Sequence, residues 1–525
     1  MKKTIFAILT MLTCFTARCI GQDLILGGEL SNSAATSIAD IDSSLSKVVK
    51  TGLNTVLVPA QWDLIEPNEG AFDFSLIDET VKIARQDNIK VIFLWFGAWK
   101  NSMSCYTPMW FKEDTKRFPR AITDNGEKME IASAFSENVF QADNRAFISF
   151  IKHIKKIDPQ KETVIMVQVE NEIGMLESAR DHSEIANKEY EKGTWRNELK
   201  QIGFYVEGKQ YEDEAFQAIY YAKYVERLAK NAKQIHNIPL YVNAAMNSRG
   251  RKPGQYPSAG PLAHLSKIWK AFAPSIDMMS PDIYDTGFKD WADKYDFKNN
   301  RLFIPESKCC TNSGVRALYV FGEHNALGFS TFSIDTAEKD AIESLQGCFS
   351  LLRQLSPIIK RNNKKDIHGV LFYKTDNQRI IKDDNITITC RHYFTLPWDK
   401  RATNGQEWQE GGGIIIKLAK NDYLIAGNGI VVSFQTNNER RQNQESKIGE
   451  DGFIINGYND DSHRSNPSLI NGKRAGIGFV DEVAIETDGK IRYLRRLNGD
   501  EDHQGRHARI PVGEWKILHV KLYEY

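Results

Sequence analysis

The stretch Met166-Val167-Gln168-Val169-Glu170-Asn171-Glu172-Ile173-Gly174 determines how we interpret this chain. Its apolar part, Ile165–Val169, is short and rich in β-branched residues, a pattern typical of a strand buried on both faces of a parallel sheet. The strand ends abruptly in two carboxylates that flank an amide. Parallel α/β enzymes place their chemistry at the carboxyl edge of the sheet, where these side chains would emerge. Since buried carboxylates are costly to desolvate, the pattern indicates a functional site.

Apolar runs of this kind alternate with helical patterns from Leu24 to about Leu355. The eight predicted strands are Leu24–Gly28, Thr55–Pro59, Val91–Phe96, Ile165–Val169, Pro239–Asn243, Met278–Pro281, Leu302–Pro305 and Gly328–Phe332. The clearest predicted helices are Phe74–Gln86, Asn144–Lys156, Asp213–His236 and Ala337–Leu355, where apolar residues recur at helical spacing. The alternation predicts an α/β fold, a (β/α)8 TIM barrel. The rival is an open doubly wound sheet, which usually begins with a Gly-rich phosphate loop that this sequence lacks.

The sequence pattern changes near Ile367, where short β-rich runs separated by Gly, Asn and Asp begin. These runs are Gly369–Tyr373, Ile386–Arg391, Gly413–Ala419, Tyr423–Ala426, Ile430–Phe434, Gly476–Ile485, Lys490–Arg495 and Trp515–Leu522. They predict a second, all-β domain, sandwich-like in architecture. We therefore expect a signal peptide at 1–21, a catalytic barrel at 22–360 and a C-terminal β-rich domain at 361–525.

Two carboxyl groups are the main candidates for chemistry. Glu172 follows the fourth predicted strand, and Glu306 follows the seventh in Ile304-Pro305-Glu306. Strands four and seven can bring their carboxyls together across the mouth of a barrel, and glycoside hydrolysis with retention needs two carboxyls about 5 Å apart. Asn171, next to Glu172, is placed to hydrogen-bond a sugar 2-hydroxyl. A single Glu after a strand is more often a helix cap or a surface charge, but this pair favours catalysis.

The run Gln168-Val169-Glu170-Asn171-Glu172 resembles the acid/base signature of family 35 glycoside hydrolases, the β-galactosidases of clan A. The resemblance implies that Glu172 is the acid/base and that Glu306 is the nucleophile. Ser280-Pro281-Asp282-Ile283-Tyr284 resembles the sixth strand of that family, which implies that Tyr284 hydrogen-bonds the nucleophile. The run from Arg495 to Glu501 resembles a bacterial branch with an uncharacterised C-terminal β-domain.

Other segments agree with the family in part. Leu26 to Ser33 resembles its first strand and sugar-binding turn, but the Asn-Ala-Glu set that binds galactose after strand three is replaced by Phe96-Gly97-Ala98-Trp99. This departure weakens the case for galactose more than the case for a retaining β-glycosidase. The remaining predicted substrate-binding residues are Glu29, Asn32, Trp62, Trp99, Glu170 and Asn243. A structural role is the alternative for each, and a buried Trp is more often part of a core.

Bulk properties exclude several partners. Lys+Arg and Asp+Glu both total 68, so a zero formal net charge gives no sign of a nucleic-acid or anionic-membrane partner. No phosphate loop, metal-binding Cys or His spacing or Gly-x-Ser-x-Gly elbow is found in the sequence, so we expect no cofactor and no metal. The expected partner is a carbohydrate substrate, and the sequence does not specify the oligomeric state.

The N-terminus predicts export. Lys2 and Lys3 precede an apolar run, Ile5–Phe15, that is too short to span a bilayer, and a small-residue region leads to Gly21. We expect cleavage near Gly21 and a periplasmic or extracellular product, with a lipid-anchored form as the alternative. Five cysteines follow, an odd number, and a bridge from Cys105 to Cys309 or to Cys310 is one option.

Three functions follow from these residues. The first is a secreted retaining exo-β-galactosidase in which Glu172 holds a raised pKa and Glu306 stays ionised. The second is a retaining β-glycosidase with another sugar preference, for a glucoside, arabinoside or glucosaminide. The third is a catalytically inactive glycan-binding protein.

Overall fold

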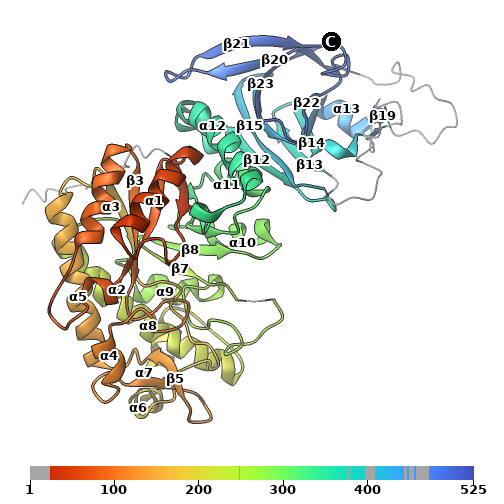
Figure 1. Cartoon of the computed structure of the whole chain (residues 1–525). Coiled ribbons are helices and arrows are strands. Elements are labelled where there is room, and N and C mark those ends of the chain that lie inside the picture. The colour runs from red at the N-terminus through yellow and green to blue at the C-terminus, as the bar shows by residue number, and fades with distance from the viewer. Residues whose placement is uncertain are drawn as a thin grey trace, which may run out of the picture.

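The computed structural model describes residues 24–247, 249–376, 378–396, 408–442, 446–448, 454–456 and 472–525 of the 525-residue chain. Figure 1 shows a barrel surrounded by helices, from which α11 and α12 lead to a stack of antiparallel sheets. The predicted signal peptide at 1–21 lies outside the described residues.

The barrel is built from parallel strands, each followed by a helix. The strands are β1 (Ile25–Glu29), β2 (Thr55–Gln61), β3 (Lys90–Phe96), β6 (Val164–Gln168), β7 (Leu240–Ala244), β8 (Met278–Ile283), β9 (Phe303–Ile304), β10 (Glu306–Ser307) and β11 (Gly328–Phe329). The sheet order is β10-β8-β7-β6-β3-β2-β1-β11-β9, with parallel pairing throughout. The predicted (β/α)8 fold is therefore confirmed.

The two ends of this order belong to one interrupted strand. β9 pairs with β11, and β10 pairs with β8, so the chain closes the barrel on both sides of Pro305. Proline has no N–H to give to a ladder, which explains why the seventh strand is split there. The interruption places Glu306 at the start of β10, at the carboxyl end of the barrel.

The outer helices are amphipathic and cover the barrel. They are α1 (Ile38–Val48), α3 (Ser75–Gln86), α5 (Glu137–Ile157), α8 (Lys209–Ile235), α9 (Ser266–Phe272), α10 (Phe288–Tyr295), α11 (Ser313–Glu323) and α12 (Lys339–Arg361). Helix α5 begins seven residues before the predicted Asn144, because Ser136 caps it by accepting a hydrogen bond from the Val139 N–H. Inside the barrel, side chains such as Ile92, Met166 and Phe303 form a packed layer below the site.

Two long segments leave the carboxyl end of the barrel. The one after β3 contains α4 (Met109–Glu113) and the hairpin of β4 (Arg120–Ile122) and β5 (Lys128–Ala132). The one after β6 contains α6 (Glu184–Lys192) and α7 (Thr194–Gln201), and a short helix, α2 (Trp62–Ile65), follows β2.

The C-terminal part contains two main antiparallel sheets. One has the order β12 (Ile367–Phe372), β15 (Gly411–Ala419), β16 (Asp422–Asn428), β23 (Lys516–Glu524), β20 (Ala475–Ile485) and β21 (Ile491–Leu497). The other has the order β13 (Arg379–Asp383), β14 (Ile386–His392), β17 (Ile430–Thr436) and β22 (Ala508–Ile510). Strands β18 (Ser446–Ile448) and β19 (Ile454–Asn456) form a separate pair, and α13 (Asn437–Gln442) follows β17. A shared apolar cluster joins the two main sheets, as in a sandwich.

The β-rich part packs closely against the barrel through α11 and α12 (Figure 1). A Cβ on Gly322 of α11 would lie 2.8 Å from the Cα of Gly369 in β12, so only glycines permit this approach. Arg316 of α11 forms a hydrogen-bonded ion pair with Glu410, which precedes β15. The junction is therefore both tightly packed and electrostatically paired.

Two sequence predictions need correction here. Strands β13 and β22 were not predicted, because their charged residues break the β-rich pattern. The five cysteines Cys105, Cys309, Cys310, Cys348 and Cys390 are all free thiols, so neither bridge suggested for Cys105 is present.

Among the described residues, no helix is both long and apolar enough to cross a membrane.

Candidate active site

Glu172 and Glu306 meet at the carboxyl end of the barrel. Glu172 lies four residues beyond the end of β6, and Glu306 is the first residue of β10. Their nearest carboxylate oxygens, together with one from Asp282, lie within 4.8 Å of one another. Only 6% of Glu172 and 5% of Glu306 is exposed. Two carboxyls about 5 Å apart have the spacing of a nucleophile and an acid/base in a retaining glycosidase.

The segment that carries Glu172 has an unusual backbone. Glu170 and Glu172 have positive φ angles of 58° and 46°, a conformation that costs a side-chain-bearing residue about 1–3 kcal/mol. The loop after β3 holds this segment in place. The N–H groups of Asn101 and Ser102 donate to the carbonyls of Asn171 and Glu172, each at 3.2 Å. The surrounding structure therefore fixes a strained segment around Glu172, as is common at functional sites.

Glu306 is oriented by Tyr284, whose hydroxyl donates a short hydrogen bond to its Oε1. This is the contact that the family resemblance implied. Burial raises the pKa of Glu306 to about 7, and the charge of Glu172 acts in the same direction, whereas Lys100 and Tyr284 act against both. The sequence led us to expect an ionised Glu306. The difference arises because several buried carboxyls lie close together, which a single strand pattern does not reveal.

Asp282 and Lys100 belong to the same cluster, and sequence reasoning missed both. Asp282 is the register partner of Glu306 on the neighbouring strand β8 and is 1% exposed. Lys100, four residues beyond β3, is 4% exposed, and its charge acts on Glu29 and Glu306. The signal for Asp282 was its place at the end of the sixth predicted strand. Three carboxylates at this spacing could also hold a cation, but Lys100 already supplies positive charge, and we assign them to proton chemistry.

Glu29, predicted to contact sugar, lies at the end of β1 beside the cluster. It is 1% exposed, and its Oε1 has no hydrogen-bond partner among the described residues. Burial, and then the charge of Glu306, raises the pKa of Glu29 well above its usual range. Glu29 therefore presents a buried carboxyl oxygen with which a ligand could form a hydrogen bond.

Asn243, which was predicted to bind substrate, forms hydrogen bonds within the protein. Its Oδ1 accepts from the backbone N–H of Glu172 at 2.9 Å, and its Nδ2 donates to Asp282 Oδ2 at 2.6 Å. Both ends of the amide are thus engaged within the protein. Asn243 holds the segment that carries Glu172 against Asp282, and these contacts leave little of its amide for a sugar hydroxyl.

Glu170 and Trp99 lie behind the site. Glu170 Oε2 accepts from the backbone N–H of Trp99 at 2.8 Å, and burial followed by the charge of Asp143 raises the pKa of Glu170 well above its usual range. Asp143 in turn accepts from Trp95 and Tyr224. The Trp99 ring is fully buried against Tyr221 and Tyr224. The structure thus places both residues in a buried layer that supports the site.

Two other predicted residues lie on the β1 and β2 side. Trp62 is fully buried in α2, donates to Glu66 Oε2 at 2.8 Å and packs against Trp110 and Phe111, so its ring forms core and not a wall of the site. The Asn32 carbonyl accepts from Gln61 Nε2 at 2.7 Å, while the Asn32 Oδ1 has no partner among the described residues.

The centre of the site contains buried polar atoms that have no partner in the described part of the chain. They are Oε1 of Glu29, both amide atoms of Asn171, the Tyr241 hydroxyl, Oδ1 of Asp282 and Oε2 of Glu306. Buried polar groups without hydrogen bonds are rare and call for an explanation. A ligand with several hydroxyl groups would satisfy this set of donors and acceptors, as a sugar does.

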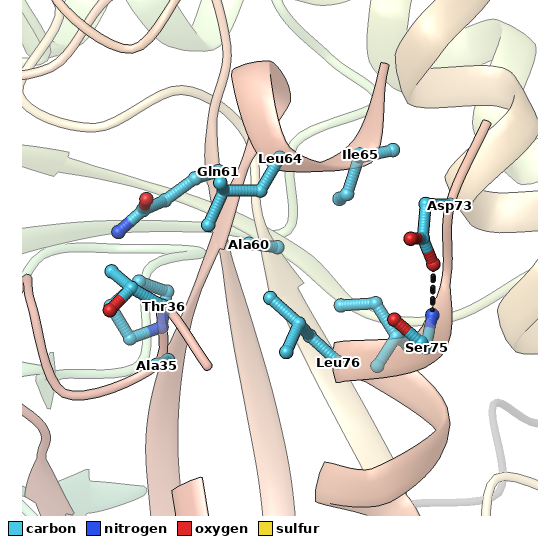
Figure 2. Close-up of a pocket in the computed structure, with 11 residues that line it drawn as sticks. Ala35, Thr36, Ala60, Gln61, Leu64, Ile65, Asp73, Ser75 and Leu76 are labelled. Atoms are coloured by element: carbon cyan, nitrogen blue, oxygen red, sulfur yellow. Dashed lines mark hydrogen bonds between the residues drawn. The ribbon is translucent and has the colours of Figure 1, made fainter. Parts of the chain in front are cut away.

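A separate cavity of about 260 Å³ lies between the end of β2 and the start of α3. Figure 2 shows Gln61 and Leu64 on one side of it and the Asp73–Ser75 turn on the other, where Asp73 accepts from the Ser75 N–H at 2.8 Å. None of the clustered carboxyls lines this cavity. We assign it no role in the chemistry.

Comparisons with known proteins agree with the fold. Residues 35–203 match a family model of glycoside hydrolase family 42, described as Beta-galactosidase. Residues 345–509 match a model described as Domain of unknown function (DUF5597). No curated protein matches the chain. The match lies within the barrel and supports a glycoside hydrolase, the class of enzyme that the sequence predicted.

Several solved structures resemble part of the chain at low identity. The β-galactosidase from the psychrophilic Marinomonas ef1 is 13% identical, with a TM-score of 0.47, over 64% of this chain and 61% of that one. The enzyme from the Antarctic haloarchaeon Halorubrum lacusprofundi is 14% identical, with a TM-score of 0.44, over 62% and 58%. The cold-adapted enzyme from Rahnella sp. R3 is 13% identical, with a TM-score of 0.47, over 64% and 57%. The chain thus spans about three fifths of the length of these proteins.

Proposed function

We propose that this protein is a retaining exo-β-glycosidase that hydrolyses terminal β-galactosyl residues of oligosaccharides or polysaccharides. The observation that carries the proposal is the separation of Glu172 and Glu306, whose oxygens lie within 4.8 Å. Inverting enzymes need about 6.5–9.5 Å between the carboxyls to admit a water molecule. The near-complete burial of both groups favours the end of a glycan chain over its middle.

The reaction proceeds in two displacements. In the first, the Glu306 carboxylate attacks the anomeric carbon while Glu172 gives its proton to the departing glycosidic oxygen, and the C1–O bond breaks. In the second, Glu172 takes a proton from water, the water oxygen bonds to C1, and Glu306 leaves as a carboxylate. Tyr284 stabilises the carboxylate form of Glu306 by donating to it, and Asn171 has free amide atoms with which to bind the sugar.

A panel of nitrophenyl β-glycosides tests this proposal. We expect hydrolysis of the β-galactoside, with turnover reduced by orders of magnitude in Glu172→Gln and in Glu306→Gln. Glu191→Gln is the matched control, because Glu191 is exposed on α6. If Glu306→Gln keeps near-normal activity, the assignment fails. Saturable glycan binding without hydrolysis of any substrate would instead favour an inactive glycan-binding protein.

A specific observation supports a second candidate, a retaining β-glycosidase with another sugar preference. Lys100 lies in the loop after β3 and is buried. In the family that the sequence resembles, this loop carries the Asn-Ala-Glu set that binds galactose. A buried ammonium beside Glu29 and Glu306 offers donors alone, which changes the hydroxyl pattern that the site accepts. Hydrolysis of a glucoside, arabinoside or glucosaminide without hydrolysis of the galactoside would favour this candidate.

The finer family assignment and the cellular location are also proposals. The acid/base motif resembles family 35, while the matched model is of family 42 and covers Glu172 but ends before Glu306. We further propose an exported protein with a signal peptide at 1–21, a barrel at 22–360 and a β-domain at 361–525. An N-terminus near Gln22 in protein recovered from the periplasm or medium would support export.

A further inference from the structure

Asp282 is a third carboxyl inside the catalytic cluster, and the two-displacement reaction does not need it. It lies on β8, in register with Glu306 on β10, and is 1% exposed. One of its oxygens lies within 4.8 Å of oxygens of both Glu172 and Glu306. A carboxyl buried this close to two others cannot be ionised together with them at low cost.

The two oxygens of Asp282 have different surroundings. Oδ2 accepts the 2.6 Å hydrogen bond from Asn243, whose other end holds the backbone of Glu172. Oδ1 is buried and has no partner among the described residues. Asn243 therefore ties Asp282 and Glu172 into one unit and leaves one oxygen of Asp282 able to carry a proton.

The charged and titratable groups around Asp282 come from several elements. They are Glu29 at the end of β1, Glu172 after β6, Tyr241 on β7, Tyr284 after β8, Tyr295 on α10 and Glu306 on β10. Burial, then the charges of Glu306 and Glu172, raises the pKa of Asp282 well above its usual range, and a hydrogen bond with Glu172 adds to the effect.

We propose that Asp282 is a positioning residue that shares one proton with Glu172, so that the pair, and not Glu172 alone, forms the general acid of the reaction. The inference rests on the proposed function. In the resting site, the proton lies between the two carboxyls. When the glycosidic bond breaks, the shared proton passes through Glu172 to the leaving oxygen, which leaves both Glu172 and Asp282 as carboxylates while Glu306 is neutral as its ester. In the second displacement the proton taken from water restores the shared state.

Losing the shared proton would create two adjacent negative charges, so the pair should stay protonated to a higher pH than a lone carboxyl. Asp282→Asn removes one of those charges and keeps the shape of the side chain. The alkaline limb of the kcat/KM profile should therefore move to lower pH by about one unit or more. Asp282→Glu restores a carboxyl and should return the limb toward the wild-type position.

The experiment measures kcat/KM against pH for the wild-type enzyme, Asp282→Asn, Asp282→Glu and the control Asp290→Asn, whose carboxyl is exposed on α10. A downward shift of the alkaline limb in Asp282→Asn alone supports the proposal. An unchanged limb overturns it, while the loss of activity in Glu172→Gln would still uphold the proposed function. A wild-type enzyme that hydrolyses no glycoside would instead overturn the proposed function.

A measurement on the wild-type protein covers the case in which Asp282→Asn does not fold. With carbon-13 at the aspartate carboxyls, we expect one aspartate signal that titrates well above the usual aspartate range and that moves when Glu172 is replaced by Gln. Burial also raises the pKa of Asp63 and of Asp143, and Asp63→Asn and Asp143→Asn identify their signals. If every aspartate other than Asp63 and Asp143 titrates within the usual aspartate range, the proposal is wrong.

Discussion

Replacing Tyr284 by Phe removes one hydroxyl and little else. That hydroxyl donates to Glu306, and it is one of the groups that hold down the pKa of a carboxyl which burial raises to about 7. A hydrogen bond to a charged group contributes about 1.5–3 kcal/mol, and 1.36 kcal/mol corresponds to about one pKa unit. Tyr284 is 47% exposed, so solvent weakens the bond and we take the lower part of this range. The pKa of Glu306 should therefore rise by about one unit.

Because the nucleophile must be ionised, a raised pKa moves the acid limb of kcat/KM to higher pH. At neutral pH, Tyr284→Phe should lose about fivefold in kcat/KM, because the ionised fraction of Glu306 falls from about one half to about one tenth, and activity should recover as the pH rises. The assay is a pH series with an activated aryl β-glycoside. Tyr205→Phe, at a tyrosine that is 78% exposed, is the control and should match the wild-type profile. An acid limb at the wild-type position in Tyr284→Phe would refute this reasoning.

Three further substitutions test the supporting structure. Gly97→Ala should destabilise the protein by about 1–3 kcal/mol in chemical unfolding, because the new Cβ would clash with Trp95 Nε1, and a stability equal to wild type would contradict the tight packing of this layer. Asn243→Ala should lower kcat/KM at least about tenfold and cost about 2–5 kcal/mol of stability, since it leaves two buried hydrogen-bond partners unpaired; an active, equally stable variant would argue against its role. Arg316→Ala should lower the unfolding free energy by about 3 kcal/mol, because it leaves the Glu410 carboxylate unpaired at the junction. Lys188→Ala, which breaks an exposed ion pair with Glu184, is the control and should change the unfolding free energy by less than about 0.5 kcal/mol.

The barrel could be predicted because its signal is repeated. All eight predicted strands are present, since each is a short apolar run that ends at turn residues, and the helices between them carry one apolar face. The split of the seventh strand at Pro305 was not foreseen, although proline gives the physical reason. In the β-rich part, β13 and β22 carry charged residues that interrupt the apolar runs, so the β pattern was too weak to find them.

The site was predictable at its centre and less so around it. Glu172, Glu306 and Tyr284 follow strand ends, where the register of a parallel barrel fixes their positions, and the structure brings them together. Asp282 also follows this rule, but one carboxyl among many in a sequence does not show that it lies beside two others. Whether Asn243 and Glu170 bind ligand or protein depends on packing between distant segments, such as the loop after β3 against the end of β6. That information is absent from any single stretch of sequence.

The most direct test of the account is to identify the residue that bonds to the sugar. A 2-deoxy-2-fluoro β-glycoside with a good leaving group slows the second displacement, so that the glycosyl-enzyme accumulates and can be digested and sequenced by mass spectrometry. We predict one added sugar, attached to the peptide that contains Glu306. A label on another residue would contradict the assignment of the nucleophile, and turnover that inverts the anomeric configuration without any covalent adduct would contradict the retaining mechanism.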